Sequence, residues 1–343
     1  MDEIISRIQK KMTNVPLQTA PKRNTNIEFL RILMMLLIVI MHFSGGSVDI
    51  NLLTQQGGPE SAWFWGYRII THIGVPTFAF ISGYFGIKLN IRKALDLEIM
   101  AITYGFIVII LAILCHHKIG ATEILQLLLP ISSGFLWYYS CYMLLMFISP
   151  ILNEGVKKIN IECFTCIISI LLPICFAGRF MLNANSCTLL TLLVIYLIGQ
   201  YLRKYKNRLI IIYRYYIFFI SLVLNILTTS ILGYLGKNIV FFLDGSNNPL
   251  TILSSISLFF IFHEMKKENT IISYMSKIAP YMLAVYILHE SIRVLGIVDI
   301  SILNGQLKLV IPTAIITVLT ISLIEFCRQY LYDKIKKRIT KDL

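Results

Sequence analysis

The sequence predicts an all-α, polytopic helical bundle that spans a membrane. Of its 343 residues, 57% are hydrophobic and only 14% are charged, whereas soluble proteins have roughly 45–50% and about 25%. The apolar residues recur in blocks of about 17–24 residues, the length that an α-helix needs to cross the hydrocarbon core. The blocks are apolar all round and lack the two-residue alternation of barrel strands, so the crossing elements are predicted to be helices.

We predict about ten transmembrane helices with both termini in the cytoplasm. Their approximate ranges are 27–45, 66–87, 97–116, 134–152, 161–178, 188–202, 209–232, 249–265, 279–298 and 309–330. A shorter apolar piece, residues 124–131, is predicted to be re-entrant or interfacial. Lysine and arginine gather in the segments that this topology turns inwards, as the positive-inside rule requires. The outward loops carry few of them, namely Lys118, Arg179, Lys237 and Lys308.

The chain is predicted to contain one transmembrane domain, residues 27–330, between a cytoplasmic N-terminal segment, 1–26, and a basic cytoplasmic tail, 331–343. No loop is long enough to form a soluble domain, so any chemistry is expected within the bundle or at its edges. The net charge of +13 is explained by topological charge facing an anionic leaflet, and no nucleic-acid partner is predicted. The seven cysteines are interpreted as small apolar side chains, and no metal site is predicted.

The first predicted span contains polar groups at unusual depths. A charged side chain inside the bilayer costs about 2.5–3.5 kcal/mol on insertion scales, so such residues are functional candidates. Arg31 and His42 are separated by roughly three helical turns and about 16 Å of rise, and they therefore share one face. This arrangement favours a passage with a cation near its inner end and a titratable base further out. The alternatives are a snorkelling arginine and a histidine bonded to a neighbouring helix.

The second span and the segment after it add further candidates. Arg68 and His72 are four residues apart, so they share one face, toward the outer side like His42. The inner side carries a basic cluster made of Lys88, Arg92 and Lys93. This cluster can hold phosphates, or it can be positive-inside charge alone. The glycines and the proline of this span weaken regular helix, which is tolerated at membrane depth only against protein or a cavity.

Two later spans contain polar or aromatic candidates. His289 and Glu290 fall near the middle of the ninth span, at a depth similar to that of His42. Arg293 can pair with Glu290 at i,i+3, so a purely structural ion pair is an alternative to a catalytic role. Trp137 opens an aromatic cluster in the fourth span. It is expected either in an interfacial belt or in a platform on which a sugar stacks.

Together these residues resemble the motifs of the integral-membrane acyltransferase 3 family, which includes bacterial O-acetyltransferases of surface polysaccharides. The motifs are Leu30-Arg31 with ten residues before His42, Gly-Val-Pro-x-Phe-x-Phe-x-Ser-Gly-Tyr from Gly74 to Tyr84, Phe135-Leu136-Trp137-Tyr138 followed by Ser149-Pro150, and Tyr286-Ile287-Leu288-His289-Glu290. They occur in the family's order over about residues 26–330. Family members often carry an Arg-x-x-Arg-like cluster after the second motif, where this sequence has its lysine-rich one.

The resemblance implies that His42 is the catalytic histidine and that Arg31 helps to bind an acyl donor, with acetyl-coenzyme A (acetyl-CoA) expected. The donor's phosphates would meet the inner basic cluster. The expected acceptor is a sugar hydroxyl of a cell-surface polysaccharide or its lipid-linked precursor, at the bacterial cytoplasmic membrane. A neutral imidazole can take the hydroxyl's proton as it attacks the thioester. The candidates for orienting the acceptor or stabilising the oxyanion are Arg68, His72, Trp137, His289 and Glu290.

Two other functions remain open at this point. About ten spans with buried charges also suit a transporter or exporter of a polysaccharide or its precursor. Against this, the polar spans one, two and nine have no matching partners in the other half, as inverted repeats would require. A scaffold subunit of a glycan-synthesis complex would use its buried histidines only for structure.

Overall fold

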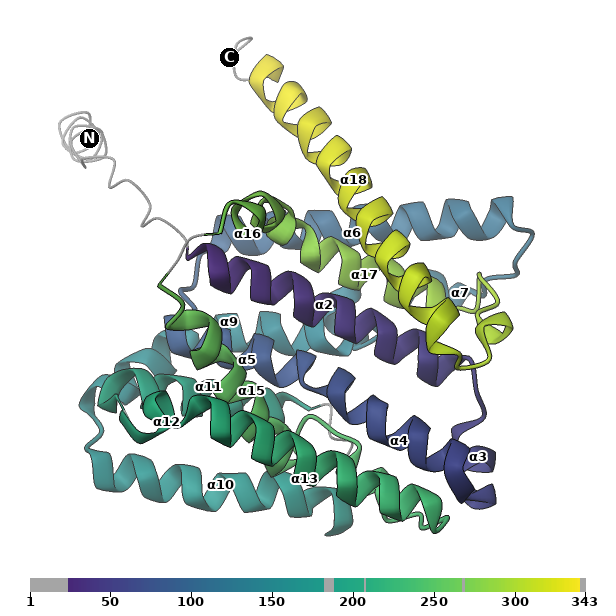
Figure 1. Cartoon of the computed structure of the whole chain (residues 1–343). Coiled ribbons are helices and arrows are strands. Elements are labelled where there is room, and N and C mark those ends of the chain that lie inside the picture. The colour runs from purple at the N-terminus through teal and green to yellow at the C-terminus, as the bar shows by residue number, and fades with distance from the viewer. Residues whose placement is uncertain (1–23, 182–187, 207, 267–268, 340–343) are drawn as a thin grey trace, which may run out of the picture.

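The computed structural model is helical, with no strand, over the residues that it describes, 24–181, 188–206, 208–266 and 269–339 (Figure 1). Most of the predicted N-terminal segment, residues 1–23, and the end of the predicted tail, 340–343, lie outside this range. The helices are α2 (Thr25–Gly46), α3 (Ile50–Gln56), α4 (Gly58–His72), α5 (Gly74–Phe85), α6 (Ile91–Leu114), α7 (Ala121–Leu128), α8 (Pro130–Ser133), α9 (Trp137–Lys158), α10 (Ile161–Met181), α11 (Leu189–Tyr205), α12 (Arg208–Ile212), α13 (Arg214–Tyr234), α14 (Val240–Leu243), α15 (Pro249–His263), α16 (Thr270–Met275), η1 (Ser276–Tyr281), α17 (Met282–Val294), η2 (Ser301–Leu303) and α18 (Leu307–Ile339).

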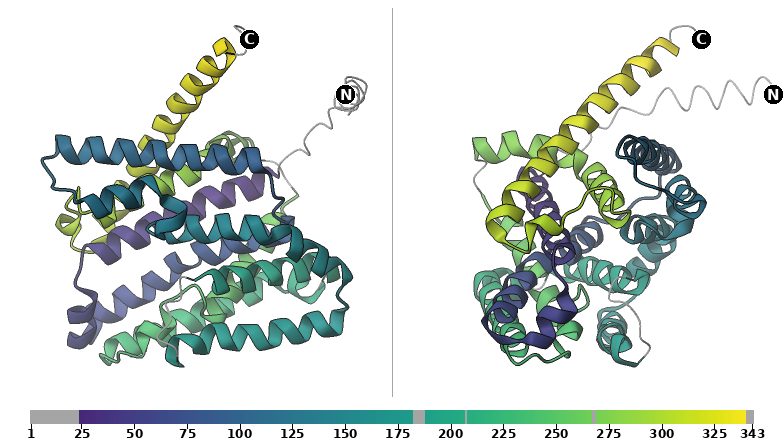
Figure 2. Two further views of the ribbon diagram at one scale, coloured as in Figure 1. Left: turned by 180° about the vertical axis from the view of Figure 1, so that it is seen from behind. Right: turned by 90° about the vertical axis from the view of Figure 1, so that its right-hand side faces the viewer.

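Most of the long helices run alongside one another in a single bundle, which Figure 2 shows from behind and nearly end-on. Within the described part of the chain, five helical stretches are long and apolar enough to cross a membrane: Thr25–Gly46, Ile91–Leu114, Arg214–Tyr234, Thr270–Val294 and Leu307–Lys334. Large apolar side chains of these helices are exposed, as expected where lipid replaces water. The fold is that of a helical membrane protein, while ten spans and cytoplasmic termini stay predictions.

α2 is the most enclosed of these five stretches. It packs against α4, α5, α15, α17 and α18, and its Leu30 and Val39 side chains are fully buried. The Asn24 side chain caps its start by accepting hydrogen bonds from the backbone N–H groups of Asn26 and Ile27. Because protein surrounds α2, a polar side chain such as His42 can be held by a neighbouring helix, here α17.

The predicted second span, 66–87, consists of two helices in place of one. α4 begins earlier, at Gly58, and ends at His72, and α5 starts at Gly74 after the single linking residue Ile73. The interruption therefore falls in the middle of the predicted span and leaves His72 at a helix end.

Pro76 explains where the helix breaks. It has no backbone N–H to donate to the carbonyl of His72, four residues earlier, so the regular ladder is interrupted there. Beside the break, Ser255 of α15 donates its hydroxyl to the carbonyl oxygen of Ile73 at 3.2 Å. The Ile73 carbonyl also accepts from the backbone N–H and the hydroxyl of Thr77, so the linking residue is tied both to α5 and to α15.

Three other predicted segments are also interrupted. Residues 209–232 form α12 and α13 with a break at Tyr213, and the span 279–298 begins as the 3₁₀ turn η1 around Pro280 before α17. The short piece 124–131 forms α7 and α8, of 8 and 4 residues, and neither is long enough to cross a bilayer.

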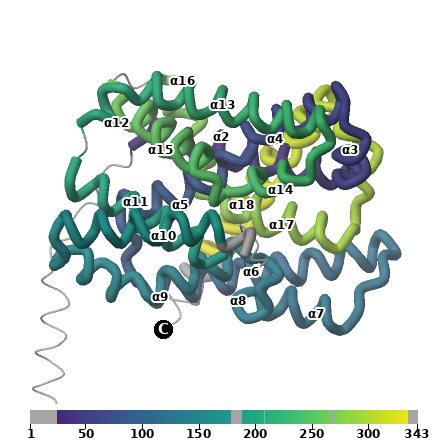
Figure 3. The backbone as a smooth tube through the Cα atoms, turned by 90° about the horizontal axis from the view of Figure 1, so that it is seen from below, coloured from purple at the N-terminus to yellow at the C-terminus, as the bar shows by residue number. Residues whose placement is uncertain are grey.

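A polar seam joins α13 to α15. The hydroxyls of Ser221 and Ser254 lie 2.7 Å apart, and the Asn225 amide donates to the hydroxyl of Thr251 at 3.0 Å. Such hydrogen bonds link helices where no hydrophobic force between them is available. α13 also packs on α4, and Figure 3 shows this group on the side of the bundle away from α6 and α9.

α18 crosses the bundle obliquely and projects beyond it (Figures 1 and 2). Its buried residues form one stripe, made of Val310, Ala314, Val318, Ile321, Ser322 and Glu325. Glu325 accepts a hydrogen bond from the Tyr104 hydroxyl of α6 at 2.7 Å and pairs with Arg328 at 2.6 Å. This link fixes α18 to α6 where apolar packing ends.

α5 and α11 approach each other closely because each has a glycine at the crossing. A Cβ atom on Gly83 would collide with the backbone carbonyl of Tyr196, and a Cβ on Gly199 would lie 2.7 Å from the amide nitrogen of Tyr84. The crossing holds α5 in place, and α5 contributes Val75, Phe78 and Ser82 to the cavity described below.

Replacing Gly83 by alanine should therefore weaken the fold. We expect Gly83→Ala to lower the free energy of unfolding by about 1–3 kcal/mol, because backbone and not a flexible side chain must move. Thermal unfolding of the purified protein in detergent measures this. Gly155→Ala is the matched control, since nothing lies within 4 Å of a Cβ there and alanine favours helix by about 0.5–1 kcal/mol. Equal thermal unfolding midpoints for Gly83→Ala and Gly155→Ala would contradict the close crossing of α5 and α11.

Candidate active site

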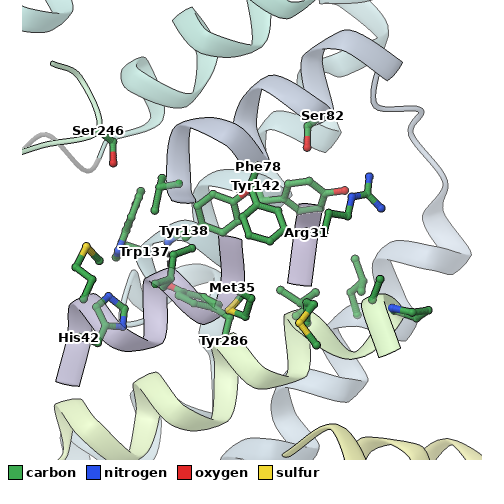
Figure 4. A pocket seen from close by; sticks show the side chains of 18 of the residues that line it. Arg31, Met35, His42, Phe78, Ser82, Trp137, Tyr138, Tyr142, Ser246 and Tyr286 are labelled. Carbon is green, nitrogen blue, oxygen red and sulfur yellow. Dashed lines mark hydrogen bonds between the residues drawn. The ribbon is translucent and has the colours of Figure 1, made fainter. Parts of the chain in front are cut away.

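An internal cavity of about 370 Å³ runs beside α2, with walls from α5, α6, α9 and α17 (Figure 4). Arg31 lies at one end of the view and His42 at the other. Both line the cavity, and Met35 and Ile38 of the same helix line it between them. Arg31 and His42 thus line one cavity from one face of α2, as their spacing predicts. We call the two ends the Arg31 end and the His42 end.

His42 is held by polar groups of α17. Its Nδ1 atom lies 2.9 Å from Oε2 of Glu290 and 2.9 Å from Nε2 of His289. Arg293, one turn further along α17, binds the same carboxylate through two N–H groups at 2.9 and 2.7 Å. Glu290 and His289 are buried, and they contact His42 from behind without lining the cavity.

The hydrogen-bond partners define the roles of the two neutral rings. Nδ1 of His289 lies 2.6 Å from the carbonyl oxygen of Val285, which only accepts, so this nitrogen carries the hydrogen and Nε2 accepts. Nδ1 of His42 then donates toward Nε2 of His289 and the carboxylate of Glu290. A neutral His42 consequently keeps Nε2 unprotonated, as the nitrogen able to accept a proton in the cavity.

His42, His289 and Glu290 are residue types that bind metal ions, and their ligand atoms lie within 4.8 Å of one another. The contacts of 2.9 Å are hydrogen-bond distances. The Arg293 guanidinium already neutralises the Glu290 carboxylate and would repel a cation beside it. The geometry therefore favours a hydrogen-bonded histidine–carboxylate group.

A second charged group, mostly enclosed by protein, lies near the His42 end. Asp244, in the loop after α14, binds Nε of Arg68 at 3.0 and 3.1 Å and Nε2 of His72 at 2.9 Å. Nδ1 of His72 lies 2.9 Å from the carbonyl oxygen of Arg68, so both ring nitrogens face acceptors. Burial alone would raise the pKa of Asp244, but the neighbouring His72 and Arg68 lower this pKa below its ordinary value. His72 lines the cavity and Arg68 does not.

The sequence assigned four basic residues to the binding of phosphates, and only some of them line the cavity. Arg31 and Lys93 line the cavity, whereas Lys88 and Arg92 are exposed outside it. Arg31 pairs at 3.0 Å with Glu28, which also lines the cavity. The structure thus brings two of the four predicted cations to the cavity and adds an acid that sequence reasoning missed.

Aromatic side chains form one wall. Trp137, Tyr138 and Tyr142 of α9 line the cavity together with Tyr286 of α17 (Figure 4). The hydroxyl of Tyr286 accepts a hydrogen bond from the backbone N–H of Tyr138 at 3.2 Å. Trp137 and Tyr138 thus face the cavity.

Sequence reasoning missed two kinds of residue. Tyr286 could have been found, because it lies three, four and seven residues before His289, Glu290 and Arg293, the spacing of one helix face. Asp244 and Ser246 could not, because a short loop carries no periodic signal that names its distant partners.

Fold and site together define a helical membrane protein with a buried histidine–carboxylate group beside an elongated internal cavity. The family model of the acyltransferase domain, acyltransferase 3, matches residues 24–325. The match covers nearly the whole chain, and the chain belongs to this family of membrane acyltransferases, as its motifs predicted. No curated protein and no solved structure gives a significant match to the chain.

The Asp244 group should contribute strongly to stability. Asp244→Asn removes the anion that pairs with the Arg68 guanidinium, and breaking a buried pair costs about 3–5 kcal/mol. Because the pKa of Asp244 is lowered in the folded protein, its contribution is complete above the ordinary carboxyl pKa and is lost as the pH falls through the folded-state pKa. The thermal unfolding midpoints of wild type and Asp244→Asn, measured in detergent, should therefore differ most near pH 7. The difference between them should narrow below about pH 4. A difference that widens on acidification contradicts this assignment.

Proposed function

We propose that the protein is a membrane O-acyltransferase that moves an acetyl group from cytoplasmic acetyl-CoA to a sugar hydroxyl. The acceptor in this proposal is a cell-surface polysaccharide or its lipid-linked precursor, at the bacterial cytoplasmic membrane. One observation carries the proposal: a single cavity has Arg31 at one end and His42 at the other. A polyanionic donor held at the Arg31 end and a neutral acceptor held at the His42 end would therefore meet at the imidazole.

The Arg31 end suits the donor. Coenzyme A carries its phosphates at one end of a narrow pantetheine arm and its thioester at the other. Arg31 and His42 are separated along α2 by about 16 Å of helix rise, and apolar side chains line the space between them. We propose that Arg31 and Lys93 bind phosphate oxygens, with Lys88 and Arg92 contacting the nucleotide outside the cavity.

The His42 end suits proton transfer. Nε2 of His42 takes the proton of the acceptor hydroxyl as its oxygen attacks the thioester carbonyl carbon. Glu290 stabilises the imidazolium that forms, through Nδ1–H, as a carboxylate does in other histidine-dependent sites. The tetrahedral intermediate collapses with loss of the C–S bond, and the thiolate takes the proton back from His42. The products are the acetyl ester and free coenzyme A.

The oxyanion of the intermediate needs a separate donor. Both ring nitrogens of His72 and both of His289 already have protein partners. Trp137, Tyr138 and Tyr142 line the cavity with N–H or O–H groups for which the structure gives no hydrogen bond among the described residues. We assign oxyanion stabilisation to the hydroxyls of Tyr138 and Tyr142 in this wall.

The histidine–carboxylate pair provides the main test. His42→Ala and Glu290→Gln should each reduce acetyl transfer to membrane glycan by at least about 10²-fold, since the first removes the base and the second weakens its orientation. Transfer of labelled acetyl from acetyl-CoA in membrane vesicles measures this. His117→Ala is the matched control, because His117 does not line the cavity. Undiminished transfer by His42→Ala at equal protein levels would remove His42 from the mechanism.

The donor end is tested by separating KM from kcat. Losing a charge-assisted hydrogen bond to phosphate costs about 1.5–3 kcal/mol, so Arg31→Ala should raise KM for acetyl-CoA by about 10–100-fold and leave kcat nearly unchanged. Arg208→Ala, an exposed arginine outside the cavity, serves as the control. A fall in kcat with unaltered KM would place Arg31 away from the donor.

A further inference from the structure

The loop between α14 and α15 contributes to the cavity although it lies far from α2 in sequence. This loop, residues 244–248, has the sequence Asp-Gly-Ser-Asn-Asn. Ser246 lines the cavity, and Figure 4 shows it with Trp137 and His42 at the end opposite Arg31. The loop therefore reaches the end where the reaction would occur.

Three anchors fix the position of Ser246. Asp244 is bound by Arg68 and His72 as described above. The Asn247 amide donates to the carbonyl oxygen of Cys175 at 2.9 Å. Asn248 donates to the side-chain oxygen of Asn225 at 3.1 Å and caps α15 by accepting from the Leu250 N–H at 2.9 Å. Each anchor comes from a different element, so the loop is held as part of the cavity wall.

One polar side chain of the anchored loop makes no hydrogen bond within the described part of the protein. Ser246 is buried, and its hydroxyl has no hydrogen-bond partner among the residues that the structure describes. Across the same end, Trp137 presents an indole ring to the cavity. Asp244 and Glu290, the nearby acids described above, are each bound by an arginine, so an electrically neutral ligand meets no uncompensated carboxylate from these two.

A hydroxyl beside an aromatic face is the combination that fits a sugar ring. A pyranose presents apolar C–H groups on its face, which pack on an aromatic ring, and hydroxyls around its edge, which need donors and acceptors. Serine supplies one donor and two acceptor sites, and tryptophan supplies a large rigid surface. A pocket with apolar walls and a few placed polar groups is typical of specific small-molecule sites.

We propose that Ser246 and Trp137 form the acceptor subsite and bind a neutral pyranose ring with one hydroxyl directed at Nε2 of His42. This inference rests on the proposed function. Asp244 and Arg68 act as positioning residues, because they hold the loop without lining the cavity, whereas His72 binds the same carboxylate from the cavity wall. The subsite thereby explains why two buried charged groups lie at the same end of the cavity.

The test uses purified protein with acetyl-CoA and a panel of methyl pyranosides, with glycerol as an acyclic polyol. Wild type should acetylate at least one pyranoside more efficiently than glycerol. Trp137→Ala should lower kcat/KM for that pyranoside by at least about 10-fold, and Ser246→Ala should raise its KM several-fold. Both variants should keep the wild-type KM for acetyl-CoA. Trp137→Phe, which keeps a ring, should recover part of the loss.

Controls separate this inference from the function on which it rests. Trp63→Ala, at a tryptophan that is 66% exposed and outside the cavity, should change neither constant. If wild type binds acetyl-CoA but acetylates no pyranoside, or prefers glycerol, the subsite assignment is wrong. Unchanged pyranoside constants in both variants also overturn it. Failure of wild type to bind acetyl-CoA or to release coenzyme A with any acceptor contradicts the acyltransferase proposal itself.

Discussion

Glu290 is only 4% exposed, and its carboxylate lies in the interior of the helical bundle, where an unpaired charge would cost several kcal/mol. Arg293 of the same helix and His42 of α2 satisfy it. This requirement sets the rotation of α17 relative to α2. Once that rotation is set, Tyr286 faces the cavity and Nε2 of His42 is the nitrogen left for chemistry. The geometry of the candidate site thus follows from balancing one buried acid.

The enclosed acidic side chains are paired with arginines in two ways. Three of them use an arginine three residues later on the same helix: Glu28–Arg31, Glu290–Arg293 and Glu325–Arg328. Such a pair forms with the helix itself and can enter the bilayer as a nearly neutral unit. Asp244 instead depends on Arg68, which is distant in sequence, so its balance exists only after the bundle has packed. The i,i+3 pairs neutralise charge within single helices, whereas the Asp244–Arg68 pair joins a loop to α4 beside the site.

Helix periodicity explains why much of the site could be predicted from sequence. The spacing of Arg31 and His42 fixes their common face, and the apolar blocks fix most helices. The break before Gly74 falls where Pro76 removes a backbone donor, in the span whose glycines and proline predicted weakened helix. The partners of Asp244 and the position of Ser246 depend on how distant helices pack. No local pattern of charge or hydrophobicity contains that information.

α2 carries both the cation of one end and the base of the other on a single rigid element. Inserting one residue between them would rotate everything beyond it by about 100° and advance it by about 1.5 Å. The imidazole would then leave the cavity although the helix stayed intact. The distance along α2 between Arg31 and His42 therefore sets both how far the donor must extend and where the reaction takes place. Insertions can lengthen this distance and keep both side chains in the cavity only by steps close to whole helical turns.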